Sequence, residues 1–172
     1  MSKTEELTLL AEALEAWKEA REGVLAELKN IPASQMLFIP TKGARSVARI
    51  VRHIIETSEM WSGELTNPEG DFTRKSFSGF IKDYASRNLQ TCVKQELVRA
   101  LKDSHRNGVK KIKRTGEIGM LQRIRRFDGD YGTRLAWMFH GVSHEEYHRA
   151  QLALYARLLG RTPALTRLIE GV

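Results

Sequence analysis

The sequence predicts an all-α protein whose helices pack as a four-helix bundle. Apolar residues recur at steps of three and four in four long segments, and no other segment has the strict alternation of a convincing strand. Three histidines also lie on or beside the apolar faces of two of these segments. We expect residues 1–172 to form a single domain, because a chain of 172 residues that is 41% hydrophobic can bury a sizeable core.

The first helix is predicted over residues 4–30. Its apolar face has steps of three and four that only Arg21 interrupts, and it comprises Leu7, Leu10, Leu14, Trp17, Val24 and Leu28. Ser2 and Glu5 have the spacing of a capping box at its start. Pro32 lies just beyond the predicted end of the helix.

The second helix is predicted to begin after Ser46, a residue type that caps helix N-termini well. Its apolar face comprises Val47, Ile50, Ile54, Trp61 and Leu65. His53 lies roughly 60° around the helix from Ile50, on the flank of this face, so it can point inward. The run from Asn67 to Gly70 is a strong turn signal that ends the segment.

The middle of the chain contains two further predicted helices, a short one over residues 79–87 and a longer one over residues 91–114 that ends before Gly116. Residues 116–132 are rich in glycine and lack a helical period, which favours a short hairpin or an ordered loop. The sequence therefore predicts a long connection before the last helix.

The last helix is predicted over residues 133–159 and is the most periodic part of the chain. Gly160 follows it as a typical C-terminal residue. The inward-facing series comprises Trp137, Gly141, His144, His148, Leu152, Tyr155 and Leu159. Two histidines are thus expected in the middle of a core face.

His144 and His148 have the i, i+4 spacing that places two imidazoles on one helix face, within reach of one metal ion. A catalytic metal usually has three protein ligands and an open position, so a third ligand from another helix is needed. His53 is the natural candidate. Alternatively, each histidine hydrogen-bonds a backbone carbonyl or a tyrosine and binds no ion, and the spacing leaves both interpretations open.

His140 continues the same ladder, but it is rotated roughly 80° from His148, so we expect it near the site and not as a ligand. His105 has no partner at a useful spacing and is expected to be structural or exposed. The run from His144 to His148 also satisfies the zincin pattern HExxH, in which Glu145 would be the general base.

The protease interpretation is disfavoured, because the only downstream residue that could serve as a third ligand is Glu170, near the chain end. Glu145 is also rotated about 100° from His144 and is expected to face solvent. The run from Ser143 to Glu145 is similar to the phospho-accepting box of histidine kinases, but it lacks that box's proline.

The net charge of +7 is concentrated in residues 99–126, the basic stretch, which has ten basic and two acidic side chains. A solvated surface is the favoured explanation, with an anionic small molecule or nucleic acid as alternatives. No apolar run approaches the ~18 residues of a membrane span, and the N-terminus lacks the order of a secretion signal. With Cys92 as the single cysteine, we expect a cytoplasmic protein.

The run FHGVSHEEYHRAQLALYARLLG resembles the hallmark helix of the DinB/YfiT-like superfamily, in which a histidine, three residues and H-R-G-Q precede an apolar run and a glycine. The spacing from Ser46 to His53 also matches the family, whose upstream histidine follows a helix-starting serine at this distance. Ala150 stands where the family usually has glycine, a small change on the helix. The order of elements is similar over roughly residues 7–160.

The resemblance implies an up-down-down-up bundle, a frequent homodimer and a divalent metal, zinc or nickel, held by His53, His144 and His148. Characterised relatives include thiol-dependent S-transferases and isomerases that use low-molecular-weight thiols. The expected function is therefore a metal-dependent enzyme, an S-transferase or a hydrolase, with a small-molecule substrate.

Glu56, His140 and Gln151 are the candidates for orienting the imidazoles, although ordinary polar roles on the helix surface remain the alternative. Two other functions also stay open. One is a non-catalytic, stress-related module that binds nucleic acid or another anionic partner through the basic stretch. The other is a folded domain whose triad has lost its metal.

Overall fold

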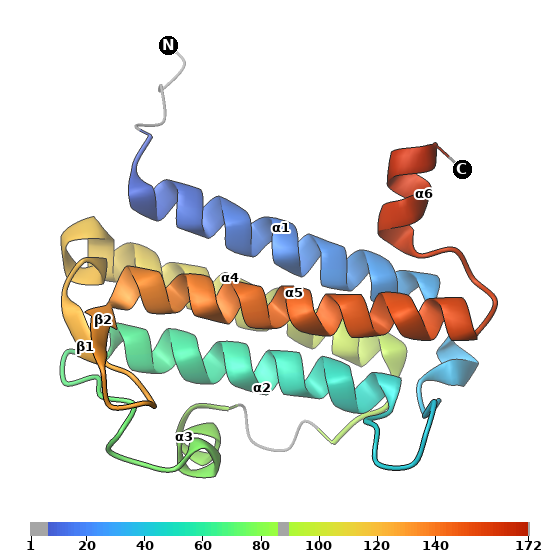
Figure 1. Ribbon diagram of the computed structural model, residues 1–172, viewed down its shortest axis with the longest axis horizontal. Helices are drawn as coiled ribbons and strands as arrows, with labels where there is room; N and C mark the ends of the chain where they lie inside the picture. The colour runs from blue at the N-terminus through green and yellow to red at the C-terminus, as the bar shows by residue number, and fades with distance from the viewer. Residues whose placement is uncertain (1–6, 86–89, 172) are drawn as a thin grey trace.

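Four long helices pack side by side within residues 7–85 and 90–171, the part of the chain that the computed structural model describes (Figure 1). They are α1 (Leu9–Asn30), α2 (Val47–Thr66), α4 (Lys94–Met120) and α5 (Arg134–Leu158). Helix α1 lies along α5, α2 lies along α4, and α2 also faces α5. Helices α1 and α5 run in one direction and α2 and α4 in the other, which confirms the predicted up-down-down-up bundle (Figure 1).

Side-chain caps determine where three of these helices begin. The hydroxyls of Thr8, Ser46 and Thr133 accept hydrogen bonds from the third backbone N–H that follows each of them, at 3.1, 3.3 and 3.0 Å. The cap at Ser46 was predicted. Helix α1 begins later than predicted, and its first predicted apolar residue, Leu7, is therefore exposed. The expected capping box of Ser2 and Glu5 lies outside the described residues.

Helices α2 and α4 run in the same direction, so a long crossover joins them, of which residues 67–85 and 90–93 are described. This crossover carries the short helix α3 (Phe77–Tyr84), which begins two residues before the predicted helix because Ser76 caps it. The predicted end of that helix, beyond residue 85, lies outside the described residues. Buried Glu64 accepts hydrogen bonds from Arg74 Nε at 2.9 Å and from Tyr84 Oη at 2.7 Å, which ties the crossover to α2.

Helix α4 extends beyond its predicted end at residue 114 and reaches Met120. Gly116 interrupts it with φ 70°, a left-handed conformation that glycine adopts at little cost, and the helix then resumes. The glycine therefore marks a kink and not the end. Met120 is fully buried, which gives the extra turn a packing role.

The connection before α5 is an antiparallel hairpin of β1 (Arg123–Arg125) and β2 (Tyr131–Thr133), one of the two predicted alternatives. Two short elements were not predicted, the 3₁₀ helix η1 (Ala33–Gln35) and α6 (Ala164–Glu170). The carboxylate of buried Glu27 on α1 accepts hydrogen bonds from the first two N–H groups of α6, at 3.0 and 3.2 Å.

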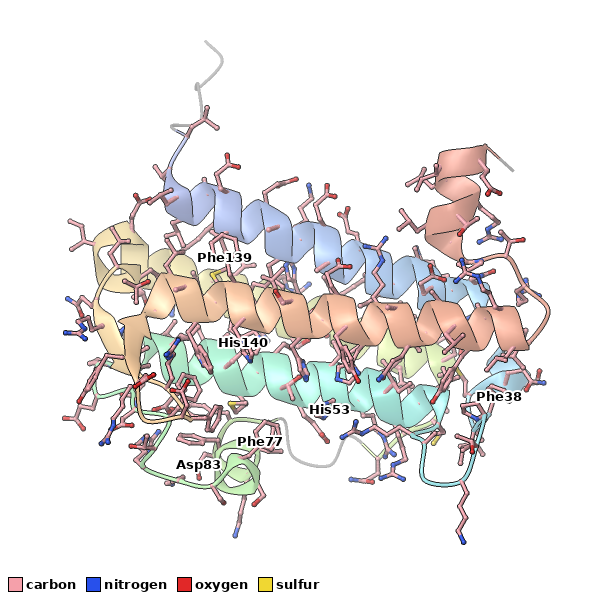
Figure 2. All side chains as sticks on the ribbon, in the orientation of Figure 1. Phe38, His53, Phe77, Asp83, Phe139 and His140 are labelled. Atoms are coloured by element: carbon pink, nitrogen blue, oxygen red, sulfur yellow. The ribbon has the colours of Figure 1, made fainter. Side chains whose placement is uncertain are left out.

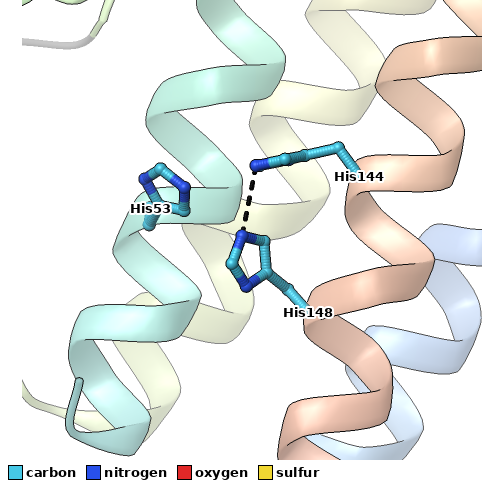
Figure 3. Close-up of side chains that lie close together, drawn as sticks. All are labelled: His53, His144 and His148. Atoms are coloured by element: carbon cyan, nitrogen blue, oxygen red, sulfur yellow. Dashed lines mark hydrogen bonds between the residues drawn. The ribbon is translucent and has the colours of Figure 1, made fainter. Parts of the chain in front are cut away.

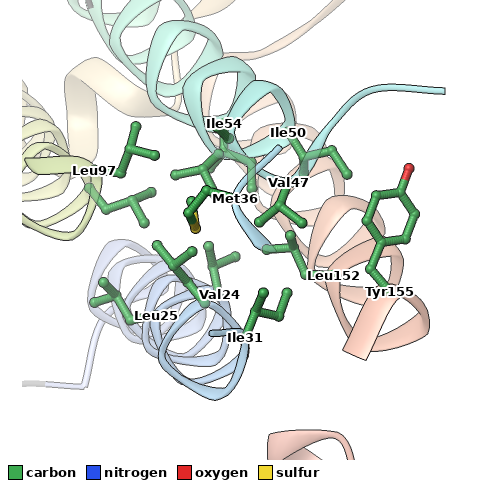
Figure 4. Close-up of a cluster of buried hydrophobic side chains, with 14 of the residues drawn as sticks. Val24, Leu25, Ile31, Met36, Val47, Ile50, Ile54, Leu97, Leu152 and Tyr155 are labelled. Atoms are coloured by element: carbon green, nitrogen blue, oxygen red, sulfur yellow. The ribbon is translucent and has the colours of Figure 1, made fainter. Parts of the chain in front are cut away.

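The core runs the length of the bundle as two clusters of buried apolar side chains. Figure 4 shows one of them, in which α2, α5 and the end of α1 meet. The other surrounds Trp17 and Trp61, whose ring centroids lie 4.5 Å apart. Within the described residues, no helix combines the length and the apolar character that a membrane span requires.

Candidate metal centre

Three histidines meet between α2 and α5 (Figure 3). One nitrogen from each of His53, His144 and His148 lies within 4.8 Å of the other two. His53 is more than 90 residues from the other two in the sequence, so only the packing of α2 against α5 brings it to them. The Nε2 atoms of His144 and His148 are 3.1 Å apart. The structure thus brings together the three side chains that spacing selected in the sequence.

Local structure explains how each ring reaches this point. The cap at Ser46 starts α2 two turns before His53, and the apolar face of α2 then turns the flank that carries this histidine toward α5. His148 lies in the buried face of α5 and is 2% exposed. Phe77 of α3 lies next to His53 with a centroid distance of 6.5 Å, so the crossover helps to cover the site (Figure 2).

Burial lowers the pKa of His53 to about 3 and the pKa of His144 to about 4, because the charged imidazolium loses its hydration. The positive charge of Arg45 and the neighbouring histidines lower both pKa values further. Burial also lowers the pKa of His148, although its hydrogen bond to Gln151 acts in the opposite direction. All three imidazoles are therefore neutral at neutral pH and have lone pairs for coordination.

The hydrogen bonds around the triad leave the facing ring nitrogens of His144 and His148 available for metal coordination. Gln151 Oε1 lies 2.9 Å from His148 Nδ1 and accepts a hydrogen bond from its N–H, which leaves Nε2 of that ring as the lone-pair nitrogen. The buried Nδ1 of His144 has no hydrogen-bond partner among the described residues. Its Nε2 lies 3.1 Å from Nε2 of His148, so the two ring nitrogens that would bind a metal ion face one another.

The donor set fits a divalent ion that accepts imidazole ligands. Two imidazole nitrogens on one tetrahedral zinc ion, each about 2.0–2.1 Å from the metal, lie about 3.3 Å apart. The 3.1 Å between the Nε2 atoms of His144 and His148 is close to that value. Three neutral nitrogen donors suit zinc, nickel or another transition metal better than magnesium or calcium, which prefer oxygen.

Glu145, the glutamate of the HExxH pattern, is not in the site. The prediction that it faces solvent was wrong, because its carboxylate is fully buried between α5 and α1. It accepts hydrogen bonds from Arg21 Nη2 at 2.6 Å, from Arg21 Nε at 2.9 Å and from Trp17 Nε1 at 2.7 Å. Arg21, which interrupts the apolar face of the first helix, thus compensates the buried charge of Glu145. Because the carboxylate is engaged in this ion pair, it is not available as a base.

The other polar candidates lie around the triad in different ways. Gln151 contacts His148 directly, as described above. His140 is exposed and stacks on Trp137 with a centroid distance of 4.3 Å, and in the described part of the chain no hydrogen bond joins it to the three histidines. Glu56 is half-buried, and no hydrogen bond joins it to the triad within the described part of the chain. His105 lies apart, with its ring edge against Trp17 at 4.6 Å.

Two hollows flank the triad. The first, the aromatic pocket, has a volume of about 60 Å³ and is lined by His144 together with Thr57, Met60, Trp61, Phe72, Phe77, Phe127, Trp137, His140 and Gly141. The second, the basic depression, has a volume of about 460 Å³ and is lined by Gly43, Ala44, Arg45, Arg49, Gln151 and Tyr155. Sequence reasoning did not identify Arg45 or Arg49, since nothing in their spacing shows that a loop and the first turn of α2 meet α5.

The basic stretch follows a different part of the surface. Residues 99–126 lie on α4 and the hairpin, and none of them lines the basic depression. Arg126, at the end of the stretch, places its guanidinium 5.7 Å from the ring centre of Trp137, beside the aromatic pocket. Arg45, and no residue of the basic stretch, is the arginine whose charge lowers the pKa of the three histidines.

Comparisons with known proteins agree with this geometry. The model of the DinB family matches residues 1–170. A DinB-like protein, YjoA from Bacillus subtilis, has a similar structure with a TM-score of 0.67 and 18% identity, over 88% of this chain and 93% of that one. YfiT from Bacillus subtilis, described as a probable metal-dependent hydrolase with an unusual four-helix bundle topology, gives a TM-score of 0.69 at 12% identity, over 94% and 95% of the two chains. No curated protein matches.

Proposed function

Since this chain belongs to the DinB family, we propose that it is a metal-dependent enzyme whose divalent ion is held by His53, His144 and His148. We further propose that it acts on a small molecule by hydrolysis or by transfer to a thiol, with zinc or nickel as the metal. The observation that carries this proposal is the convergence of three neutral imidazoles from two helices, with their nitrogens within 4.8 Å of one another.

The number of ligands supports a catalytic centre more than a structural one. Structural zinc sites usually have four protein ligands, whereas catalytic sites have three and keep a position open for water or substrate. Among the described residues, the cluster of metal-binding side chains at this point contains these three histidines and no cysteine or carboxylate. YfiT, which shares the fold, is itself described as a probable metal-dependent hydrolase.

The chain's own residues have distinct tasks in this mechanism. Gln151 holds His148 in the tautomer that directs Nε2 toward the other rings. The aromatic pocket provides a mainly apolar surface beside His144 for an apolar group. When bound, the metal ion would lower the pKa of a water molecule or a thiol, so that the nucleophile is available at neutral pH.

In the described part of the chain, neither hollow beside the triad offers a carboxylate that could take over that role. Neither the aromatic pocket nor the basic depression has an aspartate or glutamate among its described lining residues. Glu145 is engaged by Arg21 and Trp17. Nucleophile activation by the metal therefore accounts for the site better than activation by a protein carboxylate.

Metal content is the direct test. The protein, purified without a histidine tag and loaded with zinc or nickel, should retain about one equivalent of metal after gel filtration. His53→Ala should lose it, because two imidazoles from one helix bind much more weakly than three. His105→Ala is the matched control, since His105 is also a part-buried histidine with a lowered pKa but lies outside the triad.

The two reactions are distinguished by turnover of the metal-loaded protein with model ester or amide substrates, with and without added thiol. Hydrolysis without thiol supports the first reaction, and turnover only with thiol supports the second. Failure of the wild-type protein to hold zinc or nickel under any loading condition would contradict the proposal. Full metal retention by His53→Ala would also contradict it.

A further inference from the structure

The basic depression adjoins the triad and has features that the proposed metal chemistry does not use. Arg45 and Arg49 line it from the loop before α2 and from the first turn of that helix. Gln151 and Tyr155 line it from α5. Its volume of about 460 Å³ falls within the range of about 300–1,000 Å³ that is typical of small-molecule sites.

The backbone that carries Arg45 is held firmly against α5. Tyr155 Oη donates a hydrogen bond to the carbonyl oxygen of Arg45 at 2.9 Å, and the Tyr155 ring packs edge-on against Phe38 at 5.8 Å. Ser46, the next residue, caps α2. The backbone that carries this arginine is therefore fixed before any ligand arrives, and only its exposed side chain remains to be ordered on binding.

No described carboxylate neutralises the positive charge in the depression. Neither Arg45 nor Arg49 has a carboxylate within 4.0 Å in the described part of the chain, and both side chains are exposed. No acidic residue lines the depression. Arg45 nevertheless lies close enough to the triad for its charge to lower the pKa of all three histidines.

Gln151 joins the depression to the metal centre. Its side chain lines the depression and also hydrogen-bonds His148 at 2.9 Å. A molecule bound beside Gln151 is therefore adjacent to the triad, one side chain away from the ligand nitrogens. On the other side of the triad, His144 forms part of the aromatic pocket.

We propose that the basic depression is the site that binds the anionic group of the substrate, a carboxylate or phosphate, through the guanidinium groups of Arg45 and Arg49. Guanidinium groups offer paired N–H donors that match the oxygens of such anions. Together with the aromatic pocket, this assigns the substrate to the class of small organic anions with a short apolar group. The assignment rests on the proposed function, because it takes the triad as the reacting centre between the two hollows.

Anion binding to the metal-free protein provides a test that does not depend on turnover. Sodium succinate and inorganic phosphate would be titrated separately into the chelator-treated protein, with binding followed by NMR at constant ionic strength and succinamide as the uncharged comparison. The double variant Arg45→Gln/Arg49→Gln should weaken binding at least 10-fold. The charge-matched control Arg99→Gln/Lys102→Gln, on the surface of α4, should change it less than 2-fold.

Tighter binding of succinate would assign the depression to a carboxylate, and tighter binding of phosphate would assign it to a phosphate group. Equal weakening in the two double variants would overturn the proposal, because it would show a non-specific effect of net charge. Equal binding of succinamide and succinate would overturn it as well. The zinc content of the same variants separates the two proposals. If anion binding does not depend on Arg45 and Arg49 but the protein still holds stoichiometric zinc, the anion site is wrong and the proposed metal centre stands.

Discussion

Removal of the Glu145 carboxylate should destabilise the whole bundle, because this group neutralises a buried guanidinium. Arg21 is 2% exposed and Glu145 is fully buried, so neither charge is hydrated. The carboxylate accepts two hydrogen bonds from Arg21 and one from Trp17, and Arg21 Nη1 also donates to Ser104 at 2.9 Å. In Glu145→Ala, the arginine would remain buried without its counter-charge.

Loss of one partner of a buried ion pair typically costs ~3–5 kcal/mol, much of it from the charge that is left behind. For a chain of this size, each kcal/mol lowers the midpoint of thermal unfolding by roughly 2–4 °C, which predicts a fall of roughly 6–20 °C. In Arg21→Met/Glu145→Leu both charges are replaced by apolar groups. This double variant should recover at least about 2 kcal/mol relative to Glu145→Ala, since no unpaired charge stays in the core.

Urea unfolding at pH 7, followed by circular dichroism, gives the free energies of unfolding for wild type and both variants. Glu146→Ala is a suitable control, because Glu146 is the next residue on α5 and its ion pair with Arg149 is partly exposed. A wild-type unfolding midpoint for Glu145→Ala would refute the reasoning. Unchanged stability with lost turnover would instead identify Glu145 as a catalytic base.

Two further predictions concern His105 and Gln151. Burial lowers the pKa of His105 to about 4, below the ~6.5 of a histidine in the unfolded chain. Between these two pH values the unfolded chain binds more protons than the folded protein. The free energy of unfolding therefore falls as the pH drops from about 6.5 to about 4. His105→Phe preserves an aromatic edge against Trp17. Its urea midpoints at pH 7 and pH 4.5 should differ less than those of the wild-type protein, and a difference as large as in wild type would contradict this. Gln151→Ala should weaken zinc affinity by roughly 10–100-fold in a competition titration with a chelating dye, whereas His140→Ala should not. A zinc affinity of Gln151→Ala equal to that of the wild-type protein would show that Gln151 does not orient His148.

Much of the fold could be predicted because its cause is local. Helix periodicity depends on the repeat of one segment, so the four long helices and the cap at Ser46 follow from residue order alone. Elements without such a repeat were less predictable. Helix α6 depends on the carboxylate of Glu27, more than 130 positions away, and the turn after Gly116 depends on burial of Met120.

The candidate metal centre was predictable in part for the same reason. The i, i+4 spacing of His144 and His148 defines a helix face, and the position of His53 on the flank of α2 allowed an inward direction. The sequence also contains HExxH, but the pattern alone cannot show which way its glutamate points. Only packing against α1 revealed that Glu145 faces Arg21 and not the histidines.

The sequence by itself thus determined the helices, their apolar faces and the residue types that could bind a metal, because each depends on neighbours within a few turns. The tertiary structure decided which helices face one another, and through this it joined His53 to the pair on α5 and placed Arg45 beside them. Such pairings depend on contacts between distant segments, whose energies are set by how all the surfaces pack together.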